Sequence, residues 1–138
     1  MDIIIKEIDA SETWDLRHRV MWPEKTIDYV KLEEDKAGIH FGLFKGGQLM
    51  SVVSLFIVDQ QAQFRKFATD NGVQGQGYGT KLLEHLMEVA QHYNITKIWC
   101  NARTEKALFY RRFGMIEVSE EFSKEGISYV KMQRTINP

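Results

Sequence analysis

Runs of apolar and β-branched residues recur along the chain at lengths typical of β-strands, with short polar segments between them. These runs predict strands over residues 3–8, 39–44, 49–58, 63–69, 95–101, 115–122 and 127–134. Gly46 and Gly47, between the second and third runs, predict a tight hairpin turn because glycine readily adopts the positive φ that such a turn needs. The first four strands are therefore expected to form an antiparallel meander.

Helical spacing marks several of the segments between these strands. A helix is predicted over 81–93 by an apolar stripe whose members are Leu82, Leu86, Ala90 and Tyr93. Shorter helices are predicted over 12–21, where Asp9 and Glu12 suit a capping box, and over 104–113. Residues 26–36 predict a weaker helical or irregular segment. The resulting order, β-α-α-β-β-β-α-β-α-β-β, predicts an α/β (α+β) fold in which helices pack on a mixed sheet.

Composition narrows the class of protein. The chain has 138 residues, 43% of them hydrophobic, and we expect one domain over residues 1–138. The net charge of −1 creates no general field for nucleic acid or an anionic membrane, and no run approaches the ~20 apolar residues of a membrane span. The single cysteine, Cys100, fits a reducing compartment, so a soluble cytoplasmic protein is expected. The histidines lack metal-ligand spacing, and no metal is expected.

The stretch Gln74–Thr80 carries three glycines on alternate positions between a predicted strand and a predicted helix. Glycines leave the backbone N–H groups uncovered, and the first N–H groups of a helix have no internal partner. With the positive end of the helix dipole, this predicts an anion-binding cradle, most often for phosphate. The Walker A motif and the dinucleotide fingerprint both fail, because Thr80 precedes Lys81 and Gly79 follows Gly77 too closely. A plain glycine-rich turn is the other alternative.

The loop also follows the pattern Gln/Arg-x-x-Gly-x-Gly/Ala, as Gln74-Gly75-Gln76-Gly77-Tyr78-Gly79. In this context it resembles the coenzyme A pyrophosphate loop of the GCN5-related N-acetyltransferases, the GNAT family. Residues 110–115 are similar to a second family segment, and 16–24 and 122–132 resemble the ElaA-like branch. The resemblance covers the element order of the whole chain. It implies a mostly antiparallel sheet with splayed central strands four and five, and helices on both faces.

The resemblance implies acetyl-CoA as the co-substrate, with its pantetheine arm between the fourth and fifth strands. Backbone groups of Phe67, Ala68 and Thr69 would bond the pantetheine amides as an added strand. The pyrophosphate would be held by Gln74, Gly75, Gln76, Gly77, Tyr78, Gly79 and Thr80. Further along the chain, the cofactor-site candidates are Arg103, Lys106 and Phe109, and the cations that could reach the remaining phosphate are Arg103, Lys106, Arg111 and Arg112. These four cations could equally form a solvated helix face.

The implied reaction is direct attack of a primary amine on the thioester. Tyr110 matches the position of the family's general acid, and a phenol of pKa ~10 can protonate a thiolate whose conjugate acid lies near ~8.5. A backbone N–H at Phe67 or Ala68 would bind the oxyanion. The glutamate that some family members carry on the fourth strand falls near Gln63, whose amide cannot take a proton.

The base and the acceptor site have several candidates. They are Glu24, His40 and Tyr129, or an ordered water in place of a side chain. Arg17 either holds an acidic part of the acceptor or pairs with Glu24.

The sequence thus predicts an acetyl-CoA-dependent N-acetyltransferase that acts on a primary amine of a small molecule or peptide, as a monomer or homodimer. A non-catalytic acyl-CoA-binding or sensing module on the same fold is the alternative, because Gln63 stands where a base would be useful. A structural or interaction domain without a nucleotide is a third reading.

Overall fold

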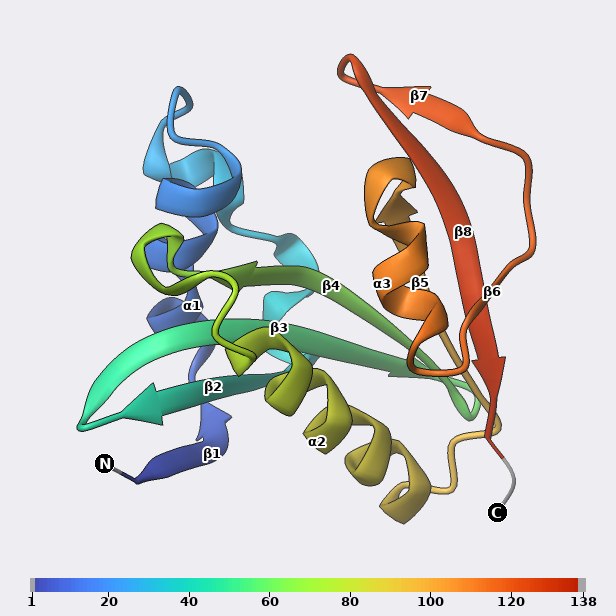
Figure 1. Cartoon of the computed structure of the whole chain (residues 1–138), viewed down its shortest axis with the longest axis horizontal. Coiled ribbons are helices and arrows are strands. Elements are labelled where there is room, and N and C mark those ends of the chain that lie inside the picture. Colours follow the sequence, from blue (N-terminus) through green and yellow to red (C-terminus); the bar gives the residue numbers. More distant parts are fainter. Residues whose placement is uncertain (1, 137–138) are drawn as a thin grey trace. The chain divides into compact units, whose positions relative to one another are not determined.

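The computed structural model describes residues 2–136 and contains the predicted elements in the predicted order. The strands are β1 (Ile3–Ile8), β2 (Ile39–Lys45), β3 (Gln48–Val58), β4 (Gln61–Thr69), β5 (Lys97–Arg103), β6 (Ile116–Glu117), β7 (Phe122–Lys124) and β8 (Ile127–Thr135) (Figure 1). The α-helices are α1 (Ala10–Leu16), α2 (Tyr78–His92) and α3 (Ala107–Arg111). A π-helix, Arg17–Met21, continues α1, and short 3-10 helices occupy Ile27–Val30 and Glu33–Ala37.

Within residues 2–136 the strands are hydrogen-bonded in the order β1-β2-β3-β4-β5-β8-β6, and β7 also pairs with β8. The first pairings are antiparallel, as the meander predicts, with Gly46 and Gly47 at φ of 60° and 80° in the β2–β3 turn. The β4–β5 pairing is parallel and joins Gln61–Gln63 to Lys97–Trp99, the first residues of β5. The predicted mixed, mostly antiparallel α/β fold is confirmed.

The chain divides into two compact units. The first contains the residues up to Phe56 together with Arg65–Met87, and the second contains Ile57–Phe64 and the residues from Glu88 onward. A core cluster of the first unit is formed by Ile8, Leu16, Val52 and Ala68. In the second unit, β5 buries Ile98, Cys100 and Ala102, and β8 buries Val130 and Met132. Alternation along β5 and β8 therefore gives this sheet one buried face.

Several element boundaries differ from the predictions, and three of the differences change an element's character. The helix predicted over 81–93 begins at Tyr78, so Gly79 lies inside its first turn. The helix predicted over 12–21 changes at Arg17 from α to π. The strand predicted over 115–122 is broken into β6 and β7, because the side chain of Ser119 accepts a hydrogen bond from Lys131 N at 2.9 Å where a strand would offer its backbone.

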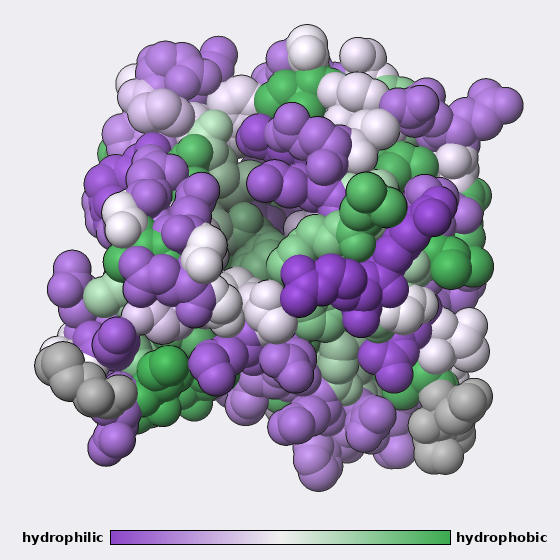
Figure 2. Space-filling view, in the orientation of Figure 1, coloured by the Kyte–Doolittle hydropathy of each residue, from purple (hydrophilic) through white to green (hydrophobic). Residues whose placement is uncertain are grey.

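Polar residues cover most of the visible surface, and apolar ones are scattered among them (Figure 2). Such scattering is normal for a folded domain. None of the helices in residues 2–136 combines the length and the apolar character that crossing a membrane requires.

Candidate functional site

Gly75 and Gly77 shape the loop before α2. Both have a φ of +84°, which side-chain-bearing residues rarely adopt, and a Cβ at either position would meet nothing within 4 Å. Conformation, not crowding, therefore requires glycine here. Residues 74–77 are exposed, and Gly77 O accepts from Lys81 N at 3.1 Å as α2 begins. An exposed backbone without side chains at a helix N-terminus fits an anion such as a pyrophosphate.

Gly79 requires glycine for a different reason. A Cβ at this position would lie 3.0 Å from Phe67 Cζ and 3.3 Å from Thr69 Oγ1. The first turn of α2 is therefore in close contact with the end of β4. Two of the predicted cofactor segments, residues 67–69 and 74–80, thus come together within the first unit.

Asp70 fixes the turn that leaves β4. Its Oδ1 accepts from Gly72 N at 2.9 Å, and its Oδ2 accepts from Arg19 Nη1 at 3.2 Å. The Gly72 N–H and the Arg19 guanidinium hold the pKa of Asp70 below its ordinary value, against an opposing effect of desolvation. The carboxylate therefore stays ionised and keeps the turn closed at neutral pH.

Gln74 ties the loop back to β4. Its Nε2 donates to Thr69 O at 3.0 Å and to Asn71 Oδ1 at 3.1 Å. The amide NH2 group is thus occupied within the protein. As a predicted cofactor residue, Gln74 offers its backbone and holds the loop in shape with its side chain.

The end of β4 has a defined orientation relative to β3. Ser51 Oγ donates to Ala68 O at 3.2 Å, and Asp70 N donates to Met50 O at 2.8 Å. Backbone groups of alternate strand residues point the same way, so Phe67 and Thr69 direct theirs to the opposite edge. The predicted pantetheine contact of Ala68 does not fit this orientation, whereas those of Phe67 and Thr69 do.

Arg17 lies in the interior with 0% of its side chain exposed. Its guanidinium donates to both carboxylate oxygens of Asp35 at 2.9 and 3.0 Å, to Val30 O at 3.0 Å and to Ser54 Oγ at 2.9 Å. The predicted pairing with Glu24 is therefore wrong; Glu24 is exposed in the turn after the π-helix. A fully buried side chain also has no surface to offer an acceptor, so the geometry gives Arg17 a structural role.

Asp35 is the counter-ion of this buried cluster. Burial pushes the pKa of Asp35 upward, but hydrogen bonds from Arg17 and from Leu32 N–H outweigh it and bring the pKa below its ordinary value. Trp14 Nε1 adds a further bond at 3.3 Å. The carboxylate is thus ionised and fully engaged, as a buried charge requires.

His40 belongs to the same cluster and is buried. Its Nε2 lies 2.8 Å from Asp35 O, which can only accept, so this nitrogen carries a proton. Its Nδ1 lies 2.7 Å from Ser54 Oγ, which also accepts from Arg17. Both ring nitrogens are therefore engaged. The prediction of His40 as a base or acceptor-site residue does not fit this geometry.

Tyr110 lies on α3 in the second unit and is half-buried. Its ring packs on those of Phe64 and Phe109, with centroid distances of 5.7 and 5.3 Å. Desolvation raises the pKa of Tyr110, the nearby Cys100 adds to this effect, and the positive charge of Arg103 opposes it. The phenol therefore keeps its proton throughout the neutral range, as a proton donor must.

Three other predicted site residues, Arg103, Lys106 and Tyr129, also belong to the second unit. Arg103 and Tyr129 are cross-strand partners on β5 and β8, and Tyr129 stacks on Phe122 at 5.9 Å. Lys106 is exposed just before α3. Burial raises the pKa of the Cys100 thiol to about 12, which argues against a covalent role.

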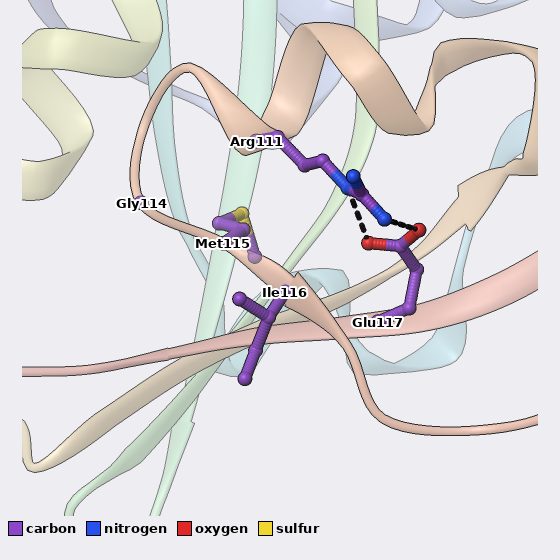
Figure 3. Close-up of a pocket in the computed structure, with 5 residues that line it drawn as sticks. All are labelled: Arg111, Gly114, Met115, Ile116 and Glu117. Atoms are coloured by element: carbon purple, nitrogen blue, oxygen red, sulfur yellow. Dashed lines mark hydrogen bonds and ion pairs between the residues drawn. The ribbon is translucent and has the colours of Figure 1, made fainter.

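Arg111 forms an ion pair with Glu117. Its Nε and Nη2 donate to the two carboxylate oxygens of Glu117 at 2.8 and 2.6 Å, beside a recess of about 350 Å³ (Figure 3). The recess is lined by Arg111, Gly114, Met115, Ile116 and Glu117. The Arg111 bonds hold the pKa of Glu117 below its ordinary value. Since the forked pair satisfies both groups, Arg111 is a poor candidate for the remaining phosphate.

Sequence reasoning missed several residues that shape the site. Asp70 had a usable signal, because Asp-Asn-Gly is a turn sequence whose aspartate can bond the backbone two residues on. Ser51 had no distinguishing signal, because Ser54 is a second serine in the same largely apolar strand. Lys66 has a φ of 56° in the middle of β4, a strained conformation that no local pattern indicates. Among residues 2–136, no three His, Cys, Asp or Glu side chains cluster closely enough to hold a metal ion.

Comparisons with known proteins show which family and fold the chain resembles. Residues 18–136 match the family model for an acetyltransferase (GNAT) domain. The "Uncharacterized N-acetyltransferase YitI" of Bacillus subtilis (strain 168) is 30% identical over 96% of this chain and 95% of that protein. Among solved structures, Escherichia coli ElaA has a TM-score of 0.77 at 18% identity, covering 96% of this chain and 99% of ElaA.

An aminoglycoside 6'-N-acetyltransferase complexed with coenzyme A has a TM-score of 0.76 at 15% identity, and 98% of each chain is covered. At such identities the two solved structures show the shared fold, whereas the family model and the YitI relative extend over nearly the whole sequence. The chain therefore belongs to the GNAT family of acetyltransferases.

Proposed function

We propose that the protein transfers the acetyl group of acetyl-CoA to a primary amine of a small molecule or peptide. The observation that carries this proposal is the loop at the start of α2. Its glycines are required by φ at Gly75 and Gly77 and by close approach at Gly79, and both requirements suit a pyrophosphate lying on bare backbone. Family membership and the coenzyme A complex of a structural neighbour support the same ligand.

The chain's own groups divide the chemistry as follows. The loop 74–80 holds the pyrophosphate, and the backbone of Phe67 and Thr69 pairs with the pantetheine amides. The amine nitrogen attacks the thioester carbonyl, and a backbone N–H of β4 stabilises the oxyanion; Phe67 is the better of the two candidates, because Ala68 turns its backbone toward β3. The C–S bond then breaks and the leaving thiolate takes its proton from the Tyr110 hydroxyl.

The reaction also requires a base. An amine with a pKa of ~10.4 must lose a proton before it attacks. His40 is engaged at both nitrogens, and Gln63 cannot accept a proton, so Glu24, Tyr129 and ordered water are the candidates. The same observations favour the second candidate function, an acyl-CoA-binding module without turnover.

Two measurements test the proposal. Titration calorimetry with acetyl-CoA should give saturable binding, and absence of binding at millimolar ligand would rule out both the enzyme and the acyl-CoA-binding module. Thiol release should then be followed against a panel of amines and peptides. Binding without turnover on any acceptor would favour the binding module.

The role of Tyr110 is tested by Tyr110→Phe, with Tyr93→Phe as the matched control. Tyr93 lies in the same unit with 52% of its surface exposed and belongs to none of the predicted site segments. Tyr110→Phe should lower kcat about 10²-fold or more, in the range for one general acid, with little change in KM. Equal kcat values for the two variants would remove the general-acid assignment.

A further inference from the structure

Ser51 is one of two serines whose hydroxyls are buried within β3, the other being Ser54. The residue is 0% exposed, and its neighbours Val52 and Val53 are equally buried. A hydroxyl removed from water destabilises the fold unless it is hydrogen-bonded. Here its oxygen lies 3.2 Å from Ala68 O and 2.9 Å from Thr69 Oγ1, both at the end of β4.

The direction of these two bonds follows from the chemistry of the groups. A carbonyl oxygen can only accept, so Ser51 must use its single proton to donate to Ala68 O. The short contact with Thr69 is then a bond in which Thr69 donates to Ser51. Thr69 Oγ1 consequently presents only lone pairs to its other neighbours and acts toward them as an acceptor.

This chain of bonds sets the presentation of the β4 backbone. Ala68 O is held toward β3, and Asp70 N is held there by Met50 O at 2.8 Å. The backbone of Phe67 and Thr69 is thereby turned to the opposite edge of β4.

Thr69 also lies against the glycine loop. Its Oγ1 would be 3.3 Å from a Cβ at Gly79, in the first turn of α2, and its carbonyl accepts from Gln74 Nε2 at 3.0 Å. Thr69 is therefore bonded through its hydroxyl to Ser51 and through its carbonyl to Gln74, in the segment that precedes α2. A buried hydroxyl on β3 thus contacts the end of β4, which is in turn bonded to the glycine loop.

We infer that Ser51 is a positioning residue for acetyl-CoA. Its hydroxyl holds the Ala68 carbonyl toward β3 and orients Thr69, so that the Phe67–Thr69 backbone faces the pantetheine amides in register with the loop 74–80. The inference rests on the proposed function, because it names the residue that preorganises the same site. Ser51 itself does not touch the cofactor.

Ser51→Ala tests the inference, with Thr13→Val as the matched control. Thr13 is also 0% exposed, lies in the same unit, and its Oγ1 donates to Ala10 O at 2.6 Å. Each variant deletes one buried hydroxyl bonded to a backbone carbonyl. Ser51→Ala should weaken acetyl-CoA binding about fivefold to tenfold, the equivalent of one hydrogen bond, with kcat at saturation unchanged. Thr13→Val should lower the thermal midpoint comparably and leave the affinity at the wild-type value.

A second pair keeps the test decisive if Ser51→Ala fails to fold. Thr69→Val keeps the shape of the side chain and removes the hydroxyl that donates to Ser51, whereas Thr69→Ser keeps it. A calorimetric affinity that is weakened in Thr69→Val and clearly less weakened in Thr69→Ser would support the inference. Wild-type affinity in Ser51→Ala or Thr69→Val, or equal weakening in Thr13→Val, would overturn it. Failure of the wild-type protein itself to bind acetyl-CoA would instead overturn the proposed function, and this inference with it.

Discussion

Replacement of Asp35 by asparagine probes the buried charge cluster of the first unit. Asp35 accepts four bonds, from Arg17 Nη1 and Nη2, Leu32 N and Trp14 Nε1. An asparagine keeps the shape but turns one oxygen into an NH2 group. In either orientation of the amide, that group would face an N–H donor, and the Arg17 charge would lose its counter-ion.

The size of the effect follows from burial. Arg17 and Asp35 have 0% and 5% of their side chains exposed, so solvent cannot replace the lost partner. Removing one member of a buried pair costs about 3–5 kcal/mol, a large part of the ~5–15 kcal/mol that stabilises a typical domain. Asp35→Asn should therefore lower the thermal midpoint by roughly 10 °C or more.

The assay is equilibrium urea unfolding followed by tryptophan fluorescence, which reports on Trp14 beside Asp35. Glu117→Gln is the matched control, because it makes the same change in a forked pair with Arg111 whose side chains are 57% and 30% exposed. Water can solvate that guanidinium, so the control should unfold near the wild-type midpoint. An Asp35→Asn variant that unfolds within about 1 kcal/mol of wild type would refute the reasoning.

The Asp35→Asn variant should also differ from the wild type in how its free energy of unfolding depends on pH. The pKa of Asp35 is lower in the folded protein than its ordinary value of ~3.9, so the unfolded chain binds the proton more tightly. The stability from Asp35 is therefore fully present above that ordinary pKa and is lost as pH falls through the folded value. The wild-type and Asp35→Asn free energies of unfolding should converge below about pH 4. A constant difference down to pH 2 would contradict this account.

Three further predictions concern backbone conformation and a buried thiol. Gly77→Ala forces a residue with a Cβ into a φ of +84°, so it should destabilise the fold by about 1–2 kcal/mol and weaken acetyl-CoA binding in calorimetry. Gly72→Ala is the control, because the atom nearest to its new Cβ would be Asp70 Oδ1 at 3.5 Å, and it should have neither effect. Asn94 has a φ of 57° just after α2, and Asn94→Gly relieves the strain of that conformation. The variant should gain up to about 1 kcal/mol in free energy of unfolding and have a higher thermal midpoint, and a lower midpoint would contradict the reasoning. Cys100, buried and with its pKa raised to about 12, should resist a thiol reagent at pH 8 until urea unfolds the protein, and rapid reaction of the folded protein would count against that burial.

Local sequence patterns determined much of this molecule. Apolar runs and helical spacing predicted the order of the elements, because strand and helix periodicities depend only on which residues of one segment face the core. The glycine loop was equally readable, since a positive φ is a local requirement that the alternating glycines meet at Gly75 and Gly77. Asn94, just after α2, adopts a φ of 57°, the left-handed conformation in which helices commonly end.

The tertiary structure decided the partners of the polar side chains. Arg17 pairs with Asp35, 18 residues away, whereas the sequence suggested either the nearer Glu24 or an acidic part of the acceptor. Ser51 on β3 donates a hydrogen bond to the Ala68 carbonyl on β4. Both ring nitrogens of His40 are hydrogen-bonded, although the sequence suggested His40 as a candidate base. The physical reason is that a polar side chain bonds whatever group shares its low-dielectric surroundings, and burial brings together groups that no local pattern relates.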